Sequence, residues 1–303
     1  MAGSKMHDDE VETDAGLVAR LLGAQFPKWA NLPIEPVPSA GTDNALYRLG
    51  PNMAVRMPRI DWAVNAVDRE HLWLPKIAPF LPVAIPTPLG NGEPGEGYPY
   101  PWSVYPWLEG ENPTVGELAD PDGLAQDLAR FVLALQAVDA TGGPRGGRGV
   151  PLEQRESPTR AAIRALQGTV DTAAVTSAWE AALEVPTWAG PPVWAHGDLS
   201  PGNLLIKDGR LTAVIDFGTL GIGDPAVDLS VAWNLLPVAT RAVYRSALNV
   251  DEATWLRGRG WALSIALIQL PYYHQTNPAL AANARHVIAE VLADVLADVQ
   301  RTG

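Results

Sequence analysis

Two short motifs joined by a predicted hairpin constrain this chain more than any other feature. The first is HGDLSPGN at residues 196–203, and the second is VIDFG at residues 214–218. A proline and a glycine turn the chain in the first motif, and two apolar runs separated by Lys-Asp-Gly-Arg follow as paired strands. This arrangement predicts Asp198 and Asn203 at the start of one strand and Asp216 at the end of the next, facing one crevice.

The residue types in these motifs match the needs of phosphoryl transfer from a nucleotide. Such a site positions a hydroxyl, holds Mg²⁺ against the β- and γ-phosphates and excludes water. An isolated H-x-D or D-F-G is more often a turn aspartate or a helix cap. The two motifs in this order, across a short hairpin, are far more specific.

Together with GDPAVDL at residues 223–229, the motifs resemble the aminoglycoside phosphotransferase family of antibiotic and small-molecule kinases, which has a protein-kinase-like fold. The resemblance extends from about Leu32 to the C-terminus. It implies that Asp198 is the catalytic base for the substrate hydroxyl and that Asn203 and Asp216 are Mg²⁺ ligands. Ser200 stands where protein kinases have a lysine, as is common in the antibiotic kinases, which argues against a protein substrate.

The same resemblance gives two residues a supporting role for the catalytic loop. These are His196, which opens the first motif, and Asp228, which follows the second. We expect Asp228 to brace the loop by accepting hydrogen bonds.

The predicted fold class is α+β, in the form of a two-lobed protein-kinase-like fold. An N-terminal lobe over residues 1–107, led by a helix within 1–30, is built on an antiparallel sheet and binds the nucleotide. A mainly helical lobe over 108–303 carries catalysis and substrate binding. The 303 residues, 47% of them hydrophobic, are enough to bury a large core.

The loop at residues 39–44 is the candidate phosphate loop of the first lobe. By resemblance Ser39, Gly41 and Asn44 bind the nucleotide, because small residues let backbone N–H groups approach phosphates. Taken alone, the loop is an ordinary hairpin turn.

Arg56 stands on the predicted strand 53–57, where the family pattern expects a lysine that contacts the phosphates. None of the lysines of the chain falls on this strand. Arginine keeps the charge but differs in reach and shape. The predicted helix 61–76, with Asp61 as its N-cap, offers Glu70 as the partner of Arg56; the alternative is a solvated helix glutamate.

Residues 102–110 read as a strand that ends in a nucleotide-binding hinge. By resemblance, Pro106 offers a carbonyl and Leu108 an N–H group to the base of the nucleotide. A buried edge strand is the alternative, and both can hold at once.

A cluster near the C-terminus is the weaker candidate for substrate contact. It contains Tyr272, Tyr273, His274 and Asn277, between two predicted helices. Such a cluster is more often an interhelical joint. His274 has no second metal ligand at a suitable spacing. The glycine-rich segment 141–149 either borders the substrate cleft or is a plain surface connection.

The composition of the chain limits the classes of molecule that we expect it to bind. A net charge of −12 and a pI near 4.8 disfavour nucleic acid and anionic membranes. The acidity suits a cationic small molecule or serves solubility alone. The absence of cysteine, of a signal-like N-terminus and of a long apolar run favours a cytoplasmic protein, as a monomer or homodimer.

The predicted function is therefore phosphorylation of a small-molecule hydroxyl by ATP or GTP with Mg²⁺. By resemblance, an aminoglycoside-type antibiotic is the favoured acceptor. A macrolide or metabolite kinase is the enzymatic alternative, and a nucleotide-binding pseudoenzyme is the other class.

Overall fold

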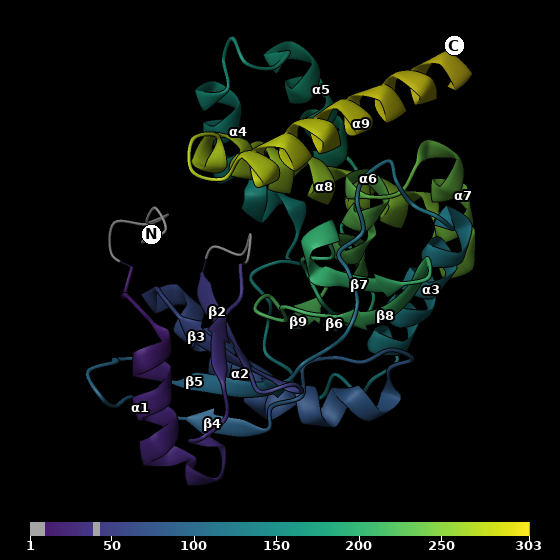
Figure 1. Cartoon of the computed structure of the whole chain (residues 1–303). Helices are drawn as coiled ribbons and strands as arrows, with labels where there is room; N and C mark the ends of the chain where they lie inside the picture. The colour runs from purple at the N-terminus through teal and green to yellow at the C-terminus, as the bar shows by residue number, and fades with distance from the viewer. Residues whose placement is uncertain (1–9, 39–42, 303) are drawn as a thin grey trace. The chain divides into compact units, whose positions relative to one another are not determined.

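The computed structural model describes residues 10–38 and 43–302, which form two compact units (Figure 1). The first unit ends at Gly110 and also includes Thr212–Gly218. The second unit comprises Glu111–Leu211 and continues from Thr219. The predicted lobe boundary after residue 107 stays a prediction.

The first unit is built on an antiparallel sheet whose five strands run in the order β1-β2-β3-β5-β4. Their bounds are Ile34–Pro36 (β1), Asn44–Leu49 (β2), Met53–Pro58 (β3), Gly90–Gly92 (β4) and Trp102–Pro106 (β5). Residues 90–92 form the edge strand β4, which pairs with β5. Gly92 makes this pairing possible, because a Cβ atom on it would lie 2.0 Å from Trp102 Cε2.

The two faces of this sheet contact different helices. Helix α1 (Ala15–Gln25), capped by Asp14, lies beside the sheet (Figure 1). Its leucines belong to one core cluster with Val55 and Met57. Side chains alternate along a strand, so Arg56 points to the opposite face, where it meets helix α2 (Asp61–Ile77). The prediction of Asp61 as N-cap is wrong: buried Ile60 precedes the helix without a side-chain cap, and Asp61 lies in the first turn.

Helices dominate the second unit. They are α3 (Pro121–Gln136), α4 (Glu156–Ala165), α5 (Thr172–Leu183), α6 (Val231–Asn234), α7 (Val238–Leu248), α8 (Glu252–Tyr273) and α9 (Pro278–Thr302). Helix α8 packs along α9 (Figure 1) and continues through Pro271 to Tyr273. Residues Pro225–Ser230 form a 3₁₀ segment, which is followed by the short α6.

Short strands frame the two motifs. Strand β6 (Val193–Ala195) pairs with β9 (Gly221–Gly223), and β7 (Leu204–Lys207) with β8 (Arg210–Val214). The predicted hairpin is therefore present, and the first motif lies between β6 and β7. Among the residues that the structure describes, no helix is long and apolar enough to cross a membrane.

Candidate active site

The backbone of the loop between β6 and β7 is hydrogen-bonded to a buried carboxylate. Asp228 accepts hydrogen bonds from the backbone N–H groups of His196 at 2.8 Å and Gly197 at 2.7 Å. Burial raises the pKa of Asp228, although His196 and the two amide hydrogen bonds oppose the rise. Gly197 has φ +80°, in the left-handed region, and a Cβ atom there would lie 3.0 Å from Thr219 Oγ1. The loop therefore has the bracing contact that the sequence predicts for Asp228.

Asp198 is partly open to solvent while two side chains hold its position. Asn203 Nδ2 donates to the backbone oxygen of Asp198 at 2.9 Å and to its carboxylate Oδ2 at 3.2 Å. Arg148 Nη1 donates to the other carboxylate oxygen and, at 2.9 Å, to the carbonyl of Gly197. The Asp198 side chain remains 29% exposed. A fixed carboxylate that solvent can reach is suited to accept a proton from a bound hydroxyl.

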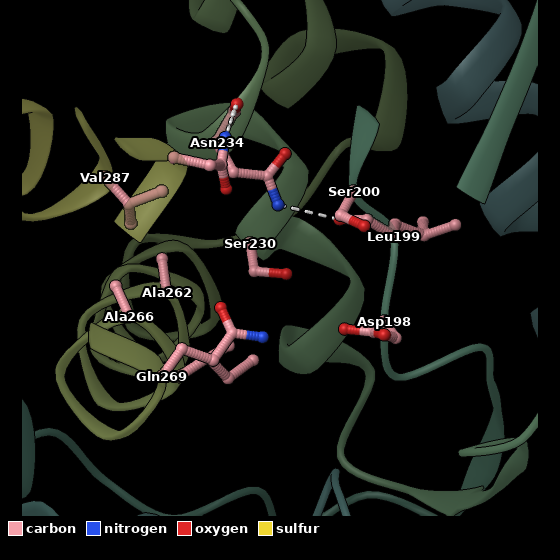
Figure 2. Close-up of a pocket in the computed structure, with 11 residues that line it drawn as sticks. Asp198, Leu199, Ser200, Ser230, Asn234, Ala262, Ala266, Gln269 and Val287 are labelled. Carbon is pink, nitrogen blue, oxygen red and sulfur yellow. Dashed lines mark hydrogen bonds between the residues drawn. The ribbon is translucent and has the colours of Figure 1, made fainter. Parts of the chain in front are cut away.

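A pocket in the second unit begins at Asp198, and Figure 2 shows the carboxylate pointing into it. We call this the Asp198 pocket. Its walls come from the catalytic loop, the segment that leads into α6, and helices α6, α8 and α9. Its lining residues are Asp198, Leu199, Ser200, Ser230, Asn234, Ala262, Ile265, Ala266, Gln269, Asn283 and Val287.

In the first unit, Arg56 links the buried Glu70 to Asp216. Its Nη1 donates to Glu70 Oε1 at 2.6 Å and its Nη2 to Asp216 Oδ1 at 2.7 Å. Glu70 has no exposed side-chain surface and also accepts from the Tyr105 hydroxyl, whereas Asp216 is 47% exposed. Burial by itself lowers the pKa of Arg56, but Glu70 and Asp216 outweigh it, so the pKa lies well above its ordinary value. The predicted pair of Arg56 with Glu70 is formed.

Asp216 has an unusual backbone conformation for its residue type. Its φ of +59° lies in the left-handed region, which a non-glycine residue adopts at some cost. Its Oδ1 accepts from the Gly218 N–H at 3.4 Å, and Arg69 Nη1 donates to the Gly218 carbonyl at 3.1 Å. These contacts fix the chain just after β8 and present the carboxylate to solvent.

The donor atoms of the two predicted Mg²⁺ ligands suit that ion. Mg²⁺ prefers oxygen ligands and is commonly bound by one or two carboxylates together with phosphate oxygens. Asp216 offers a carboxylate, and Asn203 uses its amide nitrogen for Asp198, so its amide oxygen has the ligand chemistry. Within the described ranges, no three His, Cys, Asp or Glu side chains gather into a metal site. The two ligands belong to different units, and their joint coordination of one ion stays a prediction.

The remaining nucleotide candidates are placed only in part. Ser39 and Gly41 lie outside the described residues. Asn44 opens β2 and, with its amide oxygen turned to Arg56, accepts from Nε at 3.3 Å and Nη2 at 3.0 Å. Pro106 ends β5 opposite Met53. Their nucleotide contacts, and that of partly exposed Leu108, stay predictions.

None of the four residues of the C-terminal cluster lines the Asp198 pocket. Tyr272 and Tyr273 end α8 in an edge-to-face contact, with ring centroids 4.7 Å apart. His274 Nδ1 contacts the Pro271 carbonyl at 2.9 Å. Buried Asn277 accepts from the Leu280 N–H at 3.2 Å, as a cap of α9 would. The interhelical-joint interpretation accounts for Asn277, and substrate contact by the cluster stays a prediction.

Sequence reasoning did not single out two residues that hold the catalytic loop. Arg148 contacts Asp198 from the glycine-rich segment, for which a surface connection seemed the simpler interpretation. Asn112 Nδ2 donates to the carbonyls of Pro201 (3.3 Å), Gly202 (3.0 Å) and Leu204 (2.8 Å). An arginine among closely spaced glycines was the available signal for Arg148; no pattern marked Asn112.

The fold resembles that of aminoglycoside and macrolide phosphotransferases of known structure. The GDP complex of aminoglycoside 2'-phosphotransferase-IIIa is similar over 93% of this chain and 99% of that one, with a TM-score of 0.73 and 18% identity. The macrolide 2'-phosphotransferase MphH from Brachybacterium faecium is similar over 92% and 98%, with a TM-score of 0.61 and 24% identity. At these identities the likeness establishes the fold alone.

The chain belongs to the Phosphotransferase enzyme family, whose model matches residues 34–261. An aminoglycoside 3'-phosphotransferase of Escherichia coli is 47% identical over 58 residues, which are 19% of this chain and 21% of that protein. One of Salmonella typhimurium is 36% identical over 62 residues, 20% and 23% of the two chains. The matches thus span about a fifth of the length of these curated relatives.

Proposed function

We propose that this protein is a nucleotide-dependent O-phosphotransferase that acts on a hydroxyl of a small molecule. The observation that supports it most is Asp198, a partly exposed carboxylate held by Arg148 and Asn203 at the end of a pocket. A base in this place needs a fixed position and access to its substrate. Both requirements are met without any movement of the loop.

In the proposed reaction, a hydroxyl of the acceptor enters the Asp198 pocket and its proton passes to the carboxylate. The hydroxyl oxygen forms a bond to the γ-phosphorus as the bond from that phosphorus to the β–γ bridging oxygen breaks. The products are the phosphorylated acceptor and a nucleoside diphosphate. Asn203 and Arg148 keep the carboxylate aimed during this step, and Asp228 keeps the loop backbone in place.

The donor is ATP or GTP, and residues of the first unit hold it. Arg56 is the proposed phosphate contact and Glu70 its support; solved relatives of similar fold are described as GDP and ADP complexes. Asp216 and Asn203 are the proposed Mg²⁺ ligands. When bound, the ion neutralises charge on the β- and γ-phosphates.

An aminoglycoside-type scaffold is the first candidate for the acceptor, because the curated relatives are aminoglycoside phosphotransferases. A macrolide is the second, because MphH shares the fold. A pseudoenzyme is disfavoured because Asp198, Asn203 and Asp216 are all present and each is partly exposed to solvent.

The test is the Asp198→Asn variant, with Asp208→Asn as its matched control. Asp208 is an exposed residue in the turn between β7 and β8, and asparagine tolerates its left-handed φ of +51°. We expect Mg²⁺-dependent phosphate transfer or release from ATP or GTP to fall about a hundredfold or more in Asp198→Asn. The nucleotide Kd should stay nearly constant, and the control should match the wild type.

Two outcomes contradict the proposal. Turnover of Asp198→Asn at the wild-type rate would remove this loop from catalysis. Nucleotide binding by the wild type without transfer or hydrolysis, in assays with a panel of aminoglycosides and macrolides, would identify a pseudoenzyme.

A further inference from the structure

The lining of the Asp198 pocket is nearly free of carboxylates. Among the described residues that line it, Asp198 alone carries an acidic side chain. The other polar members, Ser200, Ser230, Asn234, Gln269 and Asn283, are neutral hydroxyls and amides. A polycationic ligand is normally held by several carboxylates, because each buried ammonium group needs an anionic or strongly accepting partner. This pocket does not offer them.

The negative charge of Asp198 is already paired with the guanidinium of Arg148. Arg148 donates to Asp198. The loop that carries Arg148 is held by backbone contacts on both sides of this residue. The Asp224 N–H donates to the Gly149 carbonyl at 2.7 Å, and Arg145 forms a backbone β-bridge with Ile222. Gly221 closes against this loop, since a Cβ atom on it would lie 2.3 Å from Gly146 Cα. Arg148 is therefore held in place by backbone contacts as well as by its own ion pair.

A second guanidinium, that of Arg155, interacts electrostatically with Arg148. Arg155 lies near Arg148: burial is the main cause that lowers the pKa of Arg155, and the charge of Arg148 lowers it further. Arg155 is anchored by a hydrogen bond from its Nε to Ser264 Oγ at 3.4 Å. Asp228, which is hydrogen-bonded to Gly197 and interacts with Asp198, is a second carboxylate here. Two carboxylates and two guanidinium groups leave no negative excess to attract a ligand with several ammonium groups.

The neutral groups are suited to read hydroxyls. In Figure 2 the Gln269 amide and the Ser230 hydroxyl project into the same space as the Asp198 carboxylate. Asn234 Nδ2 donates to the Leu199 carbonyl at 2.8 Å, while its Oδ1 is buried without a partner. Amides and hydroxyls both donate and accept, so they match the paired donor and acceptor character of a hydroxyl. The apolar lining residues, which include Leu199 and Val287, can contact the face of a ring in the ligand.

We infer that the acceptor is a hydroxyl-rich ring compound, such as a glycoside or aminocyclitol, with at most one positive charge, and that Arg148 is the residue that sets this preference. The inference rests on the proposed function and narrows its acceptor class. Among the acceptor candidates given above, it favours a neutral or singly charged glycoside over a polycationic aminoglycoside.

A pair of probes that differ only in charge tests this inference. Kanamycin carries several ammonium groups, and its fully N-acetylated derivative keeps the hydroxyls but is neutral. Titration calorimetry at low salt, with nucleotide and Mg²⁺ present, measures the Kd of each for the wild type. We expect the neutral derivative to bind at least about tenfold more tightly than kanamycin. Tighter binding of kanamycin would overturn the inference.

A variant with a more acidic pocket tests the inference even when neither probe binds the wild type. The double variant Arg148→Gln/Gln269→Glu makes the pocket more acidic by two charges. The matched control, Arg164→Gln/Gln154→Glu, makes the same change at exposed residues outside the lining. We expect kanamycin affinity to rise about tenfold or more in the pocket variant, to weaken again at high salt, and to stay at the wild-type level in the control.

Failure of the pocket variant to gain kanamycin affinity, with melting temperature and nucleotide Kd preserved, would overturn the inference. An equal gain in the control would overturn it as well, since net charge alone would then be the cause. These readouts measure binding, whereas the proposed function fails on Mg²⁺-dependent turnover in the Asp198→Asn comparison. The two failures are therefore distinguishable.

Discussion

Removal of Arg56 should destabilise the first unit and impair nucleotide use together. Arg56→Ala leaves the carboxylate of Glu70, which has no exposed surface, with the Tyr105 hydroxyl as its remaining side-chain donor. Loss of one partner from a buried ion pair costs roughly 3–5 kcal/mol. Because the Arg56 side chain is 17% exposed and water can enter its space, we expect the lower end, about 3 kcal/mol.

The partner variant should cost less, and the double variant should show coupling. Glu70→Gln keeps the shape and leaves Arg56 bonded to Asp216, so about 1–2 kcal/mol is expected. In Arg56→Ala/Glu70→Gln no buried charge remains, and the loss should fall short of the sum by about 2 kcal/mol. Arg56→Lys should retain part of the nucleotide use, because the charge survives while the fork does not.

The assay is chemical unfolding followed by tryptophan fluorescence and circular dichroism, with coincidence of the two signals as the check on two-state behaviour. Arg20→Ala is the control, since Arg20 makes an exposed contact with Glu96 at 3.8 Å, worth less than about 1 kcal/mol. Additive losses in the double variant would refute the coupling. An Arg56→Ala enzyme with unchanged nucleotide KM and kcat would make Arg56 structural, and Arg48 or Arg59 would be the next candidates.

Two further predictions concern metal and pH. Asp216→Ala should abolish the Mg²⁺-dependent tightening of nucleotide binding; calorimetry with and without Mg²⁺ measures this, and an unchanged metal effect would move the ion elsewhere. Burial raises the pKa of Tyr98, whose hydroxyl donates to the Pro58 carbonyl at 2.6 Å. The pKa of Tyr98 in the folded protein lies above its unfolded value of about 10. The neutral Tyr98 hydroxyl therefore stabilises the folded state below pH 10, and this contribution is lost as the pH rises beyond that value. Tyr98→Phe should therefore lose less unfolding free energy between about pH 8 and 11 than the wild type, and equal losses would contradict the assignment.

The sequence predicted the parts of this site that depend on local pattern. The hairpin followed from turn residues between two apolar runs, and the two sheet faces follow from alternation along β3, which sets Arg56 apart from Val55. Glu70 could be paired with Arg56 because a single helix follows that strand. Family resemblance supplied the expected roles of Asp198, and the structure places it at a pocket.

The parts that the sequence missed depend on contacts between distant segments. Nothing local marks Arg148 as the partner of Asp198, because the contact needs the glycine-rich loop to be pinned against β9. The strand β4 needs the indole of Trp102 to occupy the space beside Gly92. Pro271 cannot donate a backbone hydrogen bond within α8, and the helix ends two residues later at Tyr273. Tertiary packing decides the cases of Arg148 and β4.

The replacement of the expected lysine by Arg56 is best understood as a change of geometry. A lysine ammonium acts as a point charge, whereas a guanidinium binds two acceptors at once in one plane. Arg56 uses this fork to join Glu70 to Asp216, and Arg148 uses the same chemistry to join Asp198 to the Gly197 carbonyl. Both aspartates with proposed functions are thus positioned by a guanidinium that is itself anchored elsewhere. A lysine at position 56 could keep the charge, but it could not hold two carboxylates in the same fixed relation, so the departure from the family pattern argues for an adapted site and not for a lost one.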